Sequence, residues 1–190
     1  MPKDANPTRA RILDAASKLF YREGISVSID SVAAKAGLTK RTLYYHFKSK
    51  DDLIAAYLEA RDAPNLAVFA QWFAQAKGPL PAKIESIFKN LAQSARHPKW
   101  KGCGFLRTAA ELAPMPGHPA IKIGAKHKTA VEAWLASVIA ADAGKKADEL
   151  ARQICILMDG AFSTMLIHRD PAYIEAAGRA AAALVSIRSK

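Results

Sequence analysis

The segment from Ser28 to Lys48 constrains the fold of this chain more than any other part of the sequence. It holds two short helical patterns on either side of Gly37. A helix-turn-helix needs a small residue where its helices cross, a turn residue that tolerates positive φ, and apolar inner faces. Ala33 and Gly37 meet the first two needs. The inner faces are supplied by Val32, Ala36, Leu38 and Leu43. The spacing therefore predicts a helix-turn-helix over about residues 28–48.

The second helix of such a motif enters the major groove of DNA with its amino-terminus first. Its outward residues here combine hydroxyls, cations and aromatic rings: Thr39, Lys40, Arg41, Thr42, Tyr44, Tyr45 and His46. These side chains suit base edges and phosphates. The pattern indicates DNA binding and is not typical of a catalytic pocket.

Helix start and stop signals surround this motif. Pro7 or Thr8 opens a helix that Gly24 ends, and that helix carries an apolar stripe from Ile12 to Phe20. Ser28, Thr39 and Ser49 are each placed to cap a helix. Four helix starts within about fifty residues predict a compact helical module.

The run from Leu38 to Leu53 resembles the recognition helix and following helix of TetR-family transcriptional regulators. Upstream pieces match the same family: Arg11–Ala16, Leu19, Phe20, Gly24 and Ile29–Gly37. The resemblance covers roughly residues 5–65. It implies an all-α chain, with an amino-terminal three-helix helix-turn-helix DNA-binding domain over residues 5–65. A larger helical effector-binding and dimerisation domain would follow over residues 66–190.

The resemblance also implies roles for single residues. Phosphates and thymine methyls would be contacted by Thr39, Tyr44, Tyr45 and His46, and bases by Lys40, Arg41 and Thr42. Lys50 matches the family's phosphate-clamping lysine at a helix start. Lys48 and Ser28 are further backbone candidates. The alternatives are that the tyrosines only pack, that Lys48 is a solvated charge, and that Arg9 and Arg11 are plain surface residues.

Beyond Pro64 the chain has longer amphipathic patterns and no convincing strand alternation. Helices are expected around Leu66–Phe73, Ile84–Leu91, Phe105–Leu112 and Val131–Ile139. The proline cluster between Pro114 and Pro119 must interrupt the chain. Two closing helices are expected over about 148–167 and 171–188.

The closing helices suit an interface between two copies of the chain. Leu150, Ile154, Leu157, Phe162 and Met165 line the first of them. The second carries small residues that permit close approach: Ala176, Ala177, Ala180, Ala181 and Ala183. The resemblance implies a homodimer through these two helices, which a palindromic DNA site also requires. The alternative is that the alanine-rich helix packs within its own monomer.

The resemblance further implies a small-molecule effector held among the middle helices. Aromatic and Met residues are the candidates for such a pocket: Phe69, Trp72, Phe73, Phe105, Met115, Trp134, Met158, Phe162 and Met165. Each of them could equally belong to the core. Asp159 is the polar candidate, or else a cap on a neighbouring helix.

The sequence gives little support for metal binding, redox chemistry or catalysis. His118 and His127 are nine residues apart, on opposite faces if one helix carries both. His97 and His168 could assist them, but no metal-ligand spacing accompanies them, so no metal and no cofactor is expected. Cys103 could be a redox switch, although nothing marks it as activated. No catalytic constellation is present, and the chain is not expected to be an enzyme.

The amino-terminus has no apolar signal region, and the longest charge-free runs fall short of the ~18 residues that span a membrane. A cytoplasmic protein with no membrane partner is expected.

The net charge of +11 favours a polyanionic partner, yet most of it lies outside the DNA-reading segment. Residues 1–62 hold 11 Lys and Arg against 8 Asp and Glu, and residues 63–190 hold 17 against 9. Residues 96–128 hold seven Lys and Arg against Glu111 alone. This basic segment could steer the protein toward DNA, bind an acidic effector, or be a solvated face.

We therefore expect a homodimeric transcriptional regulator, a repressor that a small effector releases from a palindromic operator. Three alternatives stay open. An activator of the same fold differs only in where its operator lies. A non-specific duplex-binding protein would show salt-sensitive binding without sequence preference. A helical enzyme with a vestigial DNA head would show turnover.

Overall fold

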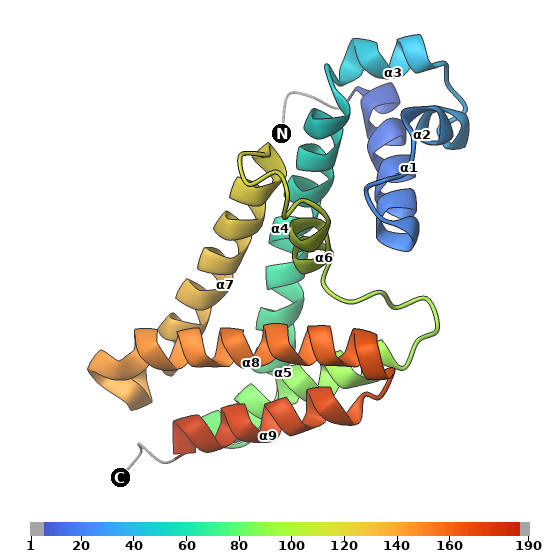
Figure 1. The fold of residues 1–190 in the computed structure, drawn as a ribbon. Helices are drawn as coiled ribbons and strands as arrows, with labels where there is room; N and C mark the ends of the chain where they lie inside the picture. Colours follow the sequence, from blue (N-terminus) through green and yellow to red (C-terminus); the bar gives the residue numbers. More distant parts are fainter. Residues whose placement is uncertain (1–5, 187–190) are drawn as a thin grey trace. The chain divides into compact units, whose positions relative to one another are not determined.

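The computed structural model describes residues 6–186, which form nine α-helices and one short 3-10 turn without a β-strand (Figure 1). The helices are α1 (Pro7–Glu23), α2 (Ile29–Lys35), α3 (Lys40–His46), α4 (Lys50–Gln75), α5 (Leu80–Ala95), α6 (Gly104–Glu111), α7 (Pro119–Ala143), α8 (Ala147–His168) and α9 (Ala172–Ser186). The all-α expectation is confirmed. Residue 5, where the expected first domain begins, and residues 187–188, where the last helix was expected to end, lie outside the described residues.

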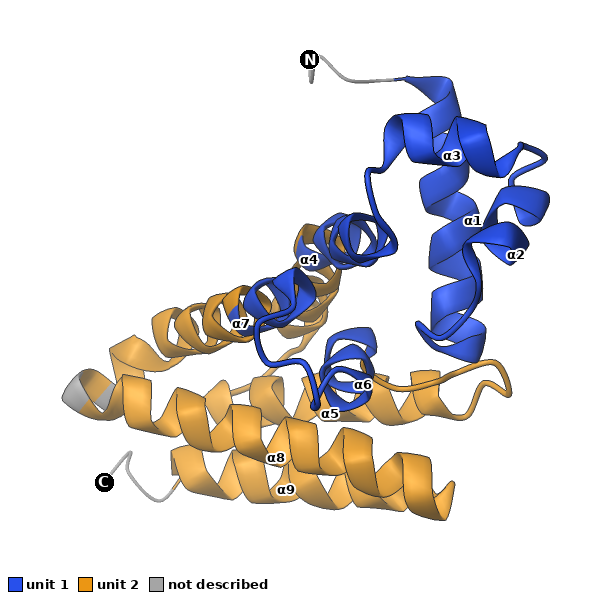
Figure 2. Ribbon diagram, turned by 45° about the horizontal axis from the view of Figure 1, so that its top comes forward, with its two compact units in different colours: residues 1–62, 104–125 blue, residues 63–103, 126–190 orange. Residues whose placement is uncertain are grey.

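The chain divides into two compact units, each made of two segments (Figure 2). Unit 1 contains the described residues up to Asp62 together with residues 104–125, and unit 2 contains residues 63–103 and 126 onward. This division differs from the single boundary expected between residues 65 and 66. It assigns α6 and the first turns of α7 to the same unit as the helix-turn-helix.

In unit 1, α1 contacts both α2 and α3, and the three helices share an apolar core. Fully or nearly fully buried members of this core include Ile12, Ala16, Val32, Leu43 and Leu53. The residues come from the apolar stripes of the sequence, as an amphipathic helix packed on one face requires.

Local signals set the ends of these helices. Ser28 Oγ accepts from Ser31 N at 3.0 Å, Thr39 Oγ1 from Thr42 N at 3.1 Å, and Ser49 Oγ from Asp52 N at 3.0 Å. The three predicted caps are thus confirmed. Gly24 ends α1 with φ of +97°, a conformation that other residues rarely adopt.

Helix α4 differs from the expected pattern because it continues through Pro64 as one helix of 26 residues. The sequence had suggested separate segments before and after this proline. A proline inside a helix removes one backbone donor and costs about 3 kcal/mol. The buried residues from Leu53 to Leu58 fix the helix ahead of it.

Unit 2 is organised by α9, which packs against both α5 and α8. The close approach to α5 occurs at Gly178, where an added Cβ would lie 2.6 Å from Cβ of Phe88. Most of the stripe expected to line a dimer surface is instead inside this unit, because Leu150, Ile154, Phe162 and Met165 are all buried. Leu157 is half-buried.

We predict that Gly178→Ala destabilises the protein by about 1–3 kcal/mol, because the new methyl group overlaps Phe88 and neither helix backbone can yield easily. Urea unfolding followed by circular dichroism measures this change. Gly160→Ala on α8 is the matched control, since no atom lies within 4 Å of its added Cβ. It should leave the free energy of unfolding equal or slightly higher. Equal effects of the two variants would contradict the close-approach explanation.

Candidate nucleic-acid interface

Helix α3 is held to unit 1 by two buried side chains. Leu43 is fully buried and Phe47, which ends the helix, is 3% exposed. The guanidinium of Arg9 lies over the Phe47 ring, 4.8 Å from its centroid. Arg9 therefore has a packing role that the sequence did not reveal.

The turn between α2 and α3 has the geometry that a helix-turn-helix requires. Gly37 adopts φ of +65°, and Leu38 N donates to Ala33 O at 2.9 Å across the turn. The Arg11 guanidinium donates to Ala36 O at 2.7 Å, which satisfies a carbonyl at the end of α2. Arg11 was expected to be a plain surface residue, and no periodicity signal points to this contact.

The sequence-predicted DNA contacts lie on the outside of the motif. Thr39, Lys40, Arg41, Tyr44, Tyr45 and Lys48 are exposed, as is Ser28, while Thr42, His46 and Lys50 are half-buried. Tyr45 is 85% exposed and Tyr44 42% exposed, so neither ring is a core side chain. The Tyr45 and His46 rings meet edge to face, with centroids 5.2 Å apart. Helix α3 thus presents hydroxyl, cationic and aromatic groups together.

One of these cations is already paired. Lys40 Nζ lies 3.0 Å from Asp30 Oδ2 on α2. The hydrogen bond and the charge of Asp30 raise the pKa of Lys40 above its ordinary value. Because both side chains are more than half exposed, the pair adds little to folding stability. It does hold the Lys40 ammonium beside a carboxylate at the start of α3.

Comparison with known proteins shows in which family this helix-turn-helix geometry is found. Residues 12–57 match the model described as bacterial regulatory proteins, tetR family. The chain is 40% identical over 62 residues to the HTH-type transcriptional regulator SrpR of Pseudomonas putida, which covers 32% of this chain and 29% of SrpR. The crystal structure of SCO4454, a TetR-family transcriptional regulator from Streptomyces coelicolor, superposes with a TM-score of 0.81 at 29% identity, covering 96% of each chain. The amino-terminal segment is therefore of the TetR-family type, and the fold of the chain matches a TetR-family structure.

The TetR-family match is strongest at the amino-terminus. AcrR of Shigella flexneri is 39% identical over 62 residues, covering 32% of this chain and 29% of AcrR. The matched segment thus spans less than a third of these two relatives. The reduced form of Escherichia coli NemR shares the fold, with a TM-score of 0.81 at 19% identity over 93% of this chain and 95% of that one.

The effector candidates are divided between the two units. Phe105 and Met115 belong to unit 1, and the remaining candidates belong to unit 2. Within unit 2 the structure brings Phe73 against Trp134, with ring centroids 5.9 Å apart, and Phe69 lies at the same distance from Trp72. Met158, Phe162 and Met165 are buried.

Asp159 forms an ion pair with Lys128, which joins α8 to α7 within unit 2. Both side chains are about one-third exposed. The sequence did not indicate Lys128 as a partner of Asp159. In the structure Asp159 contacts this lysine. Burial, reinforced by the carboxylate of Glu132, raises the pKa of nearby Cys155 to about 11. Cys155 is therefore a protonated, weakly nucleophilic thiol at neutral pH.

The histidine pair is arranged differently from the expectation. His118 precedes α7 and is not part of that helix, whereas His127 lies within it, and both are buried. Among the described residues no group of three or more His, Cys, Asp or Glu side chains could hold a metal ion.

Some of the Lys and Arg side chains of the basic segment, residues 96–128, are engaged in contacts within their own unit. Arg96 pairs with Glu175 at 2.7 Å in unit 2, and Arg107 donates to Tyr21 O at 2.7 Å in unit 1. Lys128 pairs with Asp159. Lys99, Lys122 and Lys126 are exposed. Much of the charge in this segment therefore has structural partners, and a single basic patch is not needed to explain it.

We predict that Asp30→Asn strengthens binding to non-specific duplex DNA about three- to tenfold. The substitution frees the Lys40 ammonium for a phosphate and removes a nearby negative charge. The slope of log affinity against log salt concentration should steepen by roughly 0.9, which is one added phosphate contact. Fluorescence anisotropy across a salt series measures both quantities.

Asp14→Asn provides the matched control. Asp14 pairs with Lys18 at 2.7 Å on α1, with both side chains more than 60% exposed. The charge change is identical but lies outside α2 and α3. If the two variants behave alike, net charge alone accounts for the effect and the Lys40 pair has no special part.

Proposed function

We propose that this protein is a sequence-specific DNA-binding transcriptional regulator that reads its site with α3. The observation that carries the proposal is the arrangement of α3 itself. Leu43 and Phe47 anchor one side of the helix, and Arg41, Tyr44 and Tyr45 stand exposed on the other. The expected DNA-binding residues 5–65 and the expected effector-binding and dimerisation residues 66–190 remain our functional division of the chain.

A two-fold partner would meet the α8–α9 face, which we define by Gln153, Ile156, Leu157, Ala180, Ala183 and Leu184. Ile156 is 66% exposed, and Ile167 further along α8 is 73% exposed. Apolar side chains this exposed favour an interface with another protein surface. A homodimer through this face would place two copies of α3 for the two halves of a palindromic operator.

Helix α8 is, among residues 6–186, the one helix long and apolar enough to cross a membrane. Eight of its residues are buried within unit 2, and it packs along α9. Its remaining apolar residues belong to the proposed dimer interface, so we propose a cytosolic protein. Repression, with release by a small effector held in the second part of the chain, is the regulatory mode that the family relationship supports best.

The operator is found by selecting from random duplexes, and we predict that it is a palindrome. Arg41→Ala should weaken operator binding by about 1–3 kcal/mol per bidentate contact and relax preference at the bases read by Arg41. Lys50→Ala should weaken binding to all DNA sequences alike. It should also flatten the slope of log affinity against log salt concentration by about 0.9. If neither variant alters DNA binding, α3 and the start of α4 are not the interface.

Selection of binding sites from random duplexes also distinguishes a specific regulator from the alternative functions. A specific regulator should prefer its site by ~10³ or more over random duplex, whereas a general duplex-binding protein shows no such ratio. A reporter gene behind the selected site then decides between repression and activation, because the sign of regulation depends on the position of the operator.

We predict that Ile156→Glu converts the dimer into a monomer, because a carboxylate in an apolar interface loses its hydration without gaining a partner. Sedimentation equilibrium reports the mass directly. Val68→Glu is the control, as Val68 is also exposed but lies on α4, away from the α8–α9 face. A dimer that persists in Ile156→Glu would rule out this face.

A further inference from the structure

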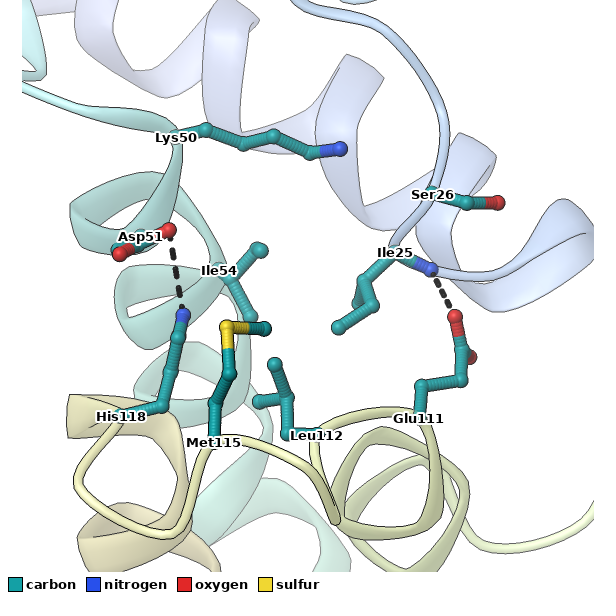
Figure 3. A pocket seen from close by; sticks show the side chains of 9 residues that line it. All are labelled: Ile25, Ser26, Lys50, Asp51, Ile54, Glu111, Leu112, Met115 and His118. Carbon is teal, nitrogen blue, oxygen red and sulfur yellow. Dashed lines mark hydrogen bonds and ion pairs between the residues drawn. The ribbon is translucent and has the colours of Figure 1, made fainter.

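Unit 1 contains a pocket of about 310 Å³ beside the start of α4 (Figure 3). It is enclosed by the link after α1, the first turns of α4, and the segment from the end of α6 to the start of α7. Four apolar side chains converge on its interior: Ile25, Ile54, Leu112 and Met115. Met115 is 53% exposed, which is unusual for so large an apolar group beside a hollow. The size and lining suit a small organic molecule.

Two carboxylates stand at the rim, each close to a nitrogen atom. Glu111 Oε2 accepts from Ile25 N at 2.9 Å. Asp51 Oδ1 lies 3.2 Å from Nε2 of His118, whose side chain is only 3% exposed. Figure 3 shows these two contacts on opposite sides of the pocket.

The tautomer of His118 follows from its second contact. Its Nδ1 accepts from Ala120 N at 3.1 Å, at the start of α7. A neutral ring that accepts at Nδ1 carries its proton on Nε2, and this buried N–H makes no hydrogen bond with the described residues, although Asp51 Oδ1 lies 3.2 Å away. The Asp51 side chain is 58% exposed, so water solvates this carboxylate and it does not demand a cationic ligand.

Lys50 is different, because among residues 6–186 no hydrogen bond or ion pair engages its ammonium. Its side chain extends along the pocket toward the side where Ser26 lies, and the Ser26 hydroxyl points away from the ammonium (Figure 3). Lys50 is thus a charged side chain of the lining that has no partner among these residues, and it stands next to an apolar interior.

We propose that this pocket binds a small organic carboxylate with an apolar body. The carboxylate would pair with Lys50, and the body would cover Ile54, Leu112 and Met115. This site lies in unit 1 and includes Met115, one of the effector candidates, whereas all the other candidates except Phe105 belong to unit 2. One consequence rests on the proposed function: because Lys50 is also a candidate phosphate contact, the carboxylate competes with DNA.

Three probes with the same phenyl body test the chemistry: phenylacetate, phenylacetamide and phenethylamine. The ¹³C-methyl signal of Met115, assigned by its loss in Met115→Leu, reports binding to the protein without DNA. Phenylacetate should shift this signal with a Kd on the order of 1 mM, as expected for so small a ligand. Phenylacetamide should bind about tenfold more weakly, and phenethylamine should cause no shift. Equal shifts by all three probes, or none by phenylacetate, would overturn the proposal.

Matched lysine variants locate the anion partner. Lys50→Gln should remove the tenfold preference for phenylacetate over phenylacetamide while the amide still binds, which also shows that the pocket is folded. Lys48→Gln, at an exposed lysine that does not line the pocket, should keep the preference. A preference that survives in Lys50→Gln would contradict the assignment.

A measurement of operator binding in the presence of phenylacetate distinguishes a failure of this proposal from a failure of the proposed function. Sodium phenylacetate at 10 times its Kd should raise the operator Kd at least threefold relative to sodium acetate at equal ionic strength, because salt alone weakens DNA binding. A Met115 shift without any specific operator means that the pocket exists and the proposed function fails. Operator binding without a Met115 shift means that the regulator exists and the pocket proposal fails.

Discussion

Helix α3 has seven residues, which is too short for a helix to be stable alone in water, so it exists only because unit 1 holds it. Burial of Leu43 and Phe47 supplies the apolar contact, and the Thr39 hydroxyl satisfies an amide at its start. The outward arrangement of every candidate DNA contact depends on this anchoring. Loss of either buried side chain would remove the platform and not merely one contact.

Unit 1 also depends on contacts that come from far along the chain. Arg107 donates to Tyr21 O at 2.7 Å, and the guanidinium of Arg61 lies 4.9 Å from the centre of the Tyr21 ring. Glu111 accepts from Ile25 N and fills the space beside Gly24, where an added Cβ would lie 2.9 Å from its carboxylate. These ties explain why residues 104–125 fold with the amino-terminal helices. The amino-terminal residues proposed to read DNA therefore fold together with a segment from later in the chain.

The sequence predicted what local chemistry determines. Hydroxyl caps at Ser28 and Thr39 and the positive φ of Gly37 depend only on neighbours in the chain, and all three appear in the structure. The contact between Ile25 and Glu111 joins residues 86 apart, and no periodicity indicates it. The same is true of the Lys128–Asp159 pair.

The apolar residues of α8 show a second limit of sequence reasoning. Because the helix carries apolar residues on several sides, the pattern could not tell its core side from an exposed side. Packing against α9 decides that Ile154 is inside and Ile156 outside. For the same reason the sequence alone does not divide the effector candidates into core and pocket residues, since aromatic residues have the same spacing in both.

The pairing of Lys40 with Asp30 has a kinetic consequence. A protein that searches for one site must leave the many wrong sites quickly, and each free cation near the groove lengthens its stay on any phosphate. A lysine held by a carboxylate 3.0 Å away contributes less to these transient encounters. The ion pair would therefore shorten residence on random DNA, so that the chain covers more sequence per unit time before it reaches its own site.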